Sequence, residues 1–60
     1  MALTIQEVLN NAEYNLSENG NIPLAVMIAK EQLQNANTLL KAGYSLDDDF
    51  DSSYENYKNQ

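Results

Sequence analysis

Six consecutive apolar residues, from Leu24 to Ala29, lie within a stretch whose spacing is otherwise that of an amphipathic helix. An α-helix turns by about 100° per residue, so six successive side chains point in every direction around its axis. They cannot all face the core of one small domain. The run therefore predicts a helix with apolar side chains on more than one side, some of which contact another chain.

The chain has 60 residues and contains neither cysteine nor histidine. A chain of this length buries only roughly 60% of the surface that its unfolded form exposes, so its stability is marginal. Disulfides and the usual zinc ligands are absent, which leaves oligomerisation or very regular helix packing to supply the missing stability. We expect one small helical domain over residues 1–60 that forms a homodimer or a higher homo-oligomer.

The first helix is expected over about residues 5–18. Thr4 and Glu7 have the spacing of a capping box, in which each side chain binds the other residue's backbone amide. Gly20 follows the point at which the apolar pattern is lost. The residues at helical spacing on one stripe are Ile5, Val8, Leu9, Ala12 and Leu16.

The second helix is expected over about residues 23–42, because Pro23 suits the first helical position and Gly43 suits a left-handed residue just after the end. Tyr44 is then placed to pack back on Leu39. The apolar stripe of this helix is wide enough to contact two neighbours.

A third, shorter helix is expected over about residues 46–57, with Ser45 as its N-cap and acidic residues in its first turn. The predicted fold class is all-α: a helical hairpin plus a shorter acidic C-terminal helix, assembled into an oligomer. The residues expected on one face of the third helix are Leu46, Phe50, Tyr54 and Tyr57.

The second helix is the expected oligomer interface. Leu24 and Met27 project from its otherwise polar side. Together with Ile22 they form an exposed apolar patch or, alternatively, they pack on Phe50 and Tyr54 of the same chain. The predicted interface residues are Leu24, Val26, Met27, Ile28, Leu33 and Leu40.

The densest charge cluster consists of Asp47, Asp48, Asp49 and Asp51. The first interpretation is a helix start stabilised by the helix dipole, the second an acidic patch for a basic protein partner, and the third a weak divalent-cation site. A calcium loop of the EF-hand type is not expected, because glycine and glutamate are missing at the positions that such a loop requires.

Tyr14 lies about 180° around the first helix from Ile5, so we expect it to point away from the core. There it is either an anchor for a partner or ligand, since tyrosine offers a large contact area at low entropic cost, or an ordinary exposed aromatic residue. Lys30, Asn37 and Lys41 form a ridge along the second helix, where the first interpretation is that the side-chain stems cover apolar surface and the lysines pair with nearby carboxylates. Repeated around a symmetry axis, that ridge and Tyr14 would suit a small anion.

The net charge of −6, with three cationic residues, argues against direct binding to nucleic acid or to an anionic membrane and permits a basic partner. No arrangement of residues matches a nucleophilic, nucleotide-binding or metal motif. We expect no enzymatic activity, no cofactor and no metal. The first residues lack the features of a secretion signal, so we expect a cytoplasmic protein.

In its size, acidity and asparagine-rich helical character, the whole chain resembles the small accessory proteins that bacteriophages encode to disable host factors. The resemblance implies a non-enzymatic binding or inhibitor protein that acts on a protein partner. Two alternatives remain from other classes: an oligomer that sequesters a small anionic signalling nucleotide between its protomers, and a structural assembly subunit.

Overall fold

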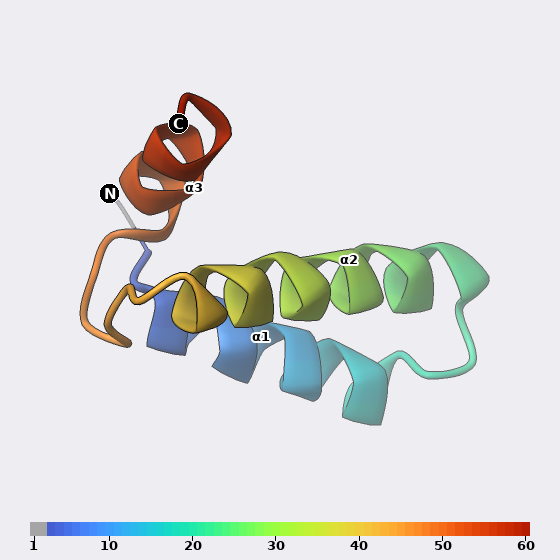
Figure 1. The fold of residues 1–60 in the computed structure, drawn as a ribbon. Helices are drawn as coiled ribbons and strands as arrows, with labels where there is room; N and C mark the ends of the chain where they lie inside the picture. Colours follow the sequence, from blue (N-terminus) through green and yellow to red (C-terminus); the bar gives the residue numbers. More distant parts are fainter. Residues whose placement is uncertain (1–2) are drawn as a thin grey trace.

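A computed structural model describes residues 3–60, which form three α-helices, Ile5–Glu18 (α1), Pro23–Lys41 (α2) and Phe50–Lys58 (α3). The first two residues, which the sequence assigns to the same domain, lie outside the described part. Helices α1 and α2 run antiparallel, side by side, as the expected hairpin (Figure 1). Helix α3 lies at the end of the hairpin that is far from the α1–α2 loop. The described chain is elongated, with dimensions of 36 × 20 × 19 Å.

The predicted range of α1 and its predicted capping box are both confirmed. The Thr4 hydroxyl accepts a hydrogen bond from the Glu7 amide at 3.1 Å, and the Thr4 amide donates to the Glu7 carboxylate at 3.0 Å. Gly20 follows the last turn. A Cβ atom at Gly20 would lie 2.7 Å from the carbonyl oxygen of Leu16, so only glycine fits where the chain turns towards α2.

Helix α2 ends as its sequence predicts. Gly43 has a φ of 104°, its amide donates to the Leu40 carbonyl, and the Tyr44 amide donates to the Leu39 carbonyl at 3.1 Å. This is the Schellman arrangement of a helix C-terminus. Tyr44 also packs against the core cluster that contains Leu39, as expected.

The predicted start of the third helix is wrong: α3 begins at Phe50, not at Leu46, and Asp49 caps it in place of Ser45. A helix beginning at Leu46 would use the Leu46 carbonyl to bind the Phe50 amide. Instead, that carbonyl accepts from the Gln6 amide at 3.0 Å, and the Phe50 amide donates to the Leu3 carbonyl at 2.8 Å. The segment before α3 is a turn because the N-terminus of α1 takes its carbonyl groups.

The core lies between the hairpin and α3, near the N-terminus of α1. Ile5 and Leu39 are fully buried there, and Phe50 and Tyr54 of α3 pack over the cluster with their rings stacked at a centroid distance of 6.0 Å. Towards the α1–α2 loop the buried apolar residues are the small side chains Ala12 and Ala29. The two ends of the hairpin therefore differ, since only one of them is covered by a third element.

Replacing Gly43 with alanine is expected to destabilise the fold by about 1–2 kcal/mol, because a Cβ atom is strained at positive φ. The urea midpoint of unfolding, followed by circular dichroism, measures the loss. Gly43→Asn should lose less, since asparagine enters this region more readily. An alanine variant with the midpoint of the parent would contradict the role given to this turn.

Candidate functional site: the exposed surface of helix 2

The most unusual surface of the chain is an apolar patch where α2 begins, made of Ile22, Leu24, Met27 and Ile28. Leu24 and Met27 are each 64% exposed, Ile28 is 48% exposed and Ile22 is 47% exposed. Leu24, Met27 and Ile28 are three and four residues apart, so their side chains adjoin on the helix surface. The predicted exposure of apolar residues in this run is confirmed within the protomer.

The alternative in which Leu24 and Met27 pack on α3 is wrong. Phe50 and Tyr54 pack against the core cluster at the other end of the hairpin, where α2 ends and not where it begins. Helix α3 lies at the end of the hairpin that is far from the α1–α2 loop (Figure 1). The apolar patch therefore has no cover from within residues 3–60.

The other predicted interface residues lie closer to the core. Val26 and Leu33 are half-buried on one flank of α2. Leu40 packs against the core cluster of its own chain. Within the chain, the exposed residues of the predicted interface are thus limited to the first half of α2.

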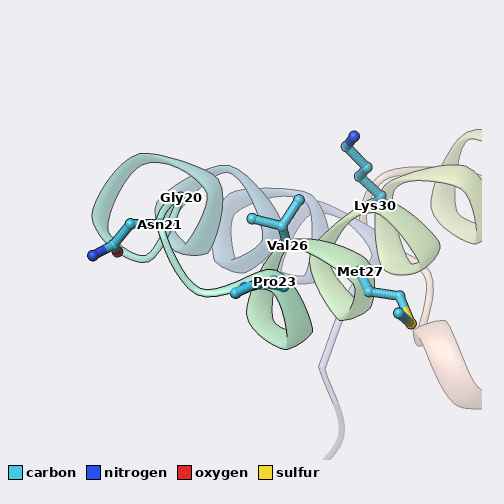
Figure 2. A pocket seen from close by; sticks show the side chains of 6 residues that line it. All are labelled: Gly20, Asn21, Pro23, Val26, Met27 and Lys30. Carbon is cyan, nitrogen blue, oxygen red and sulfur yellow. The ribbon is translucent and has the colours of Figure 1, made fainter.

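A hollow of about 460 Å³ opens beside the apolar patch. Val26 and Lys30 extend to one side of α2, Met27 points to the other, and Asn21 lies at the loop end (Figure 2). The hollow combines apolar side chains with one cation, but it is open to solvent. Its lining residues are Gly20, Asn21, Pro23, Val26, Met27 and Lys30.

The residues predicted for an anionic ligand do not form one site within the chain. Lys30, Asn37 and Lys41 are exposed along one side of α2, and of these only Lys30 lines the hollow. Tyr14 is 64% exposed on the face of α1 that is opposite its buried stripe, as expected. Tyr14 and Lys30 thus lie on outward faces of different helices, and only contacts between protomers would bring them together.

The four clustered aspartates have different local roles. Asp49 accepts from the Ser52 amide at 2.8 Å through Oδ2, as the N-cap of α3, and Asp48 accepts from the Ser45 amide at 2.8 Å. Asp47 and Asp51 are exposed, and Asp51 lies in the first turn of α3. No three carboxylates of residues 3–60 are grouped so that they could hold a metal ion. Asp48 is exposed as well, but among residues 3–60 only Asp47 and Asp51 of this cluster have carboxylates that make no hydrogen bond.

Charge is unevenly distributed between the helices. Of the nine acidic residues only Glu31 lies in α2, whereas two of the three cations, Lys30 and Lys41, are there. Helix α1 and the segment after α2 carry the remaining eight carboxylates and one lysine. The outer face of α2 is thus the part of the chain where another acidic molecule meets the least repulsion.

The sequence did not predict three residues of the hollow: Gly20 and Pro23 were interpreted only as a helix stop and a helix start, and Asn21 was given no role. Their place in the hollow depends on the path of the loop, which no periodicity encodes.

No helix in the part of the chain that the structure describes is long and apolar enough to cross a membrane. No protein-family model, curated protein or solved structure matches the chain.

Replacing Asp49 with alanine is expected to lower the free energy of unfolding by about 1 kcal/mol, through loss of the α3 N-cap. Asp49→Ser should keep most of it, because a serine hydroxyl also caps. Asp47→Ala removes the same charge without removing a cap, and should change the urea midpoint little. Equal destabilisation by all three variants would show that charge, and not capping, matters here.

Proposed function

We propose that this chain is a non-enzymatic cytoplasmic binding protein that self-associates through the apolar patch and inhibits a protein partner through its acidic surface. The observation that carries the proposal is the separation of the two surfaces. The outer face at the start of α2 is apolar and nearly uncharged, while eight of nine carboxylates lie on other parts of the chain. Such a molecule can pair through one face and keep the other for a basic partner.

Self-association is supported by the imbalance between buried and exposed apolar side chains. Three of the six buried core residues are alanines, whereas Leu24, Met27 and Ile28 are about half exposed or more. Fully burying a leucine, isoleucine or methionine side chain contributes roughly 1.5–3 kcal/mol. Covering this patch therefore yields a gain that is large relative to the stability of a chain this small.

The acidic surface suits long-range attraction of a basic protein. Carboxylates gathered around one end of a molecule raise the rate at which an oppositely charged partner arrives, and salt screens that effect. Asp47 and Asp51 are exposed at the start of α3, beside the chain's N-terminal segment. The compositional resemblance to phage-encoded accessory proteins fits an inhibitor that works by occupying a surface of its target.

The double variant Asp47→Asn/Asp51→Asn is expected to slow association with the partner by roughly tenfold at low salt and to flatten its salt dependence. The partner is first captured from the source cell on the immobilised parent chain and identified by mass spectrometry. Surface plasmon resonance at several salt concentrations then gives the rate constants. Asp48 is left unchanged because its carboxylate holds the turn before α3.

Glu13→Gln/Glu18→Gln is the matched control, since it removes two exposed charges from α1 instead. Parent-like association rates for Asp47→Asn/Asp51→Asn would remove the aspartate cluster from the mechanism. A larger loss in the control would move the contact to α1. A melting curve for each variant separates these effects from the small contribution of Asp51 to α3 stability.

A second candidate function, sequestration of a small anion between protomers, is favoured by the hollow beside Lys30. An apolar wall next to one ammonium group suits a ligand with a flat apolar part and a negative charge, such as a nucleotide. Symmetry would add a second lysine to such a site, and Tyr14 of a neighbouring protomer offers a surface for a base to stack on.

If the second candidate is correct, native mass spectrometry of protein purified from its source will show a retained ligand, and Lys30→Ala and Tyr14→Ala will each abolish retention. An anchoring tyrosine typically contributes about 2 kcal/mol or more, close to a thirtyfold loss of affinity. Lys41→Ala, which removes a cation outside the hollow, is the control. Retention by all variants, or no ligand in the parent, excludes sequestration at this site.

A further inference from the structure

We infer that the apolar patch pairs with the same patch of a second copy about a two-fold axis beside Met27, with the two α2 helices antiparallel. The inference rests on the self-association proposed above and specifies its geometry. In this arrangement Met27 lies near Met27 of the second copy, and Leu24 packs towards Ile28 of the second copy. The contact involves the loop-end half of each α2.

Charge limits where a second copy can bind. The chain has a net charge of −6, so most pairs of surfaces on two copies repel each other. At the patch, the nearest charges on α2 are Lys30 and Glu31, which are opposite in sign. Two copies therefore approach each other here at the least electrostatic cost.

A two-fold axis through the patch follows from the limited extent of the apolar surface along α2. A symmetric contact places a patch on itself, so each exposed apolar side chain of one copy meets apolar side chains of the other. Along the same outer face the patch is followed by Glu31, Gln34 and Thr38, which are polar. A pairing shifted further along α2 would bury Leu24 and Met27 against those polar groups.

The antiparallel direction follows from where the acidic cluster lies. Asp47–Asp51 is at the end of the hairpin opposite the loop, in a molecule 36 Å long. Parallel helices would bring the acidic ends of both copies together and would place Glu31 against Glu31. In antiparallel helices that overlap only at their first halves, the two acidic clusters lie at opposite ends of the dimer. Both clusters then remain exposed to a partner.

Cysteine scanning tests this geometry directly, because the chain has no cysteine of its own. Leu24→Cys, Met27→Cys and Ile28→Cys are made singly, all at exposed positions, and are oxidised mildly at tens of micromolar protein. A disulfide forms only when two Cα atoms come within about 7 Å. Gln34→Cys, on the same outer face two turns further along, is the control for random collision.

The expected result is a disulfide dimer for Met27→Cys that forms at least tenfold faster than for Gln34→Cys. An equal mixture of Leu24→Cys and Ile28→Cys should give a mixed dimer in excess of either self-linked dimer. Efficient self-linking of Leu24→Cys, without the mixed dimer, would show parallel helices and overturn the inference.

Sedimentation of the parent chain separates the failure of this geometry from the failure of the proposed function. An oligomer in which Met27→Cys cross-links no faster than Gln34→Cys overturns the pairing but leaves self-association standing. A parent that stays monomeric at high micromolar concentration overturns both, and leaves the apolar patch to a different protein. Circular dichroism of each cysteine variant shows that it folds as the parent does.

Discussion

The backbone hydrogen bonds between the turn before α3 and the first turn of α1 hold this small fold together. The carbonyl groups of Leu46 and Asp48 accept the amides of Gln6 and Ile5 at 3.0 and 2.9 Å, and the Thr4 hydroxyl takes the amide of Glu7. The N-terminal amides of a helix have no partner inside the helix. Here the segment before α3 supplies two of those partners, and the same contact places Phe50 over the core.

The same contact leaves the opposite end of the hairpin without cover. Helix α3 is fixed where α1 begins and α2 ends, so it cannot also shield the start of α2. Towards the loop end, the small residues Ala12 and Ala29 are the only apolar side chains that the described chain fully buries. The exposure of Leu24 and Met27 is thus a consequence of how the chain closes on itself, and the proposed pairing of two copies completes what one copy leaves open.

Closure of the chain also decides which acidic groups are available to a partner. The carboxylates of Asp48 and Asp49 accept hydrogen bonds from backbone amides in the turn and at the start of α3. The second carboxylate oxygen of Asp49 is buried without a hydrogen-bond partner among the described residues. Asp47 and Asp51 point outward. The cluster therefore contains two aspartates that hold the local backbone and two whose carboxylates make no hydrogen bond among the described residues.

Features that depend on neighbours a few residues apart can be predicted from the amino-acid sequence. These are the capping box of α1, Pro23 at the start of α2, the left-handed Gly43, the outward direction of Tyr14 and the excess of apolar residues in the run from Leu24 to Ala29. The start of α3, the end of the hairpin that α3 covers and the shape of the hollow beside Lys30 become visible only in the folded chain. The start and placement of α3 depend on bonds between backbone groups far apart in the sequence, such as the Gln6 amide and the Leu46 carbonyl, and no local pattern encodes these bonds. The hollow depends on the path of the α1–α2 loop, which side-chain periodicity does not encode either.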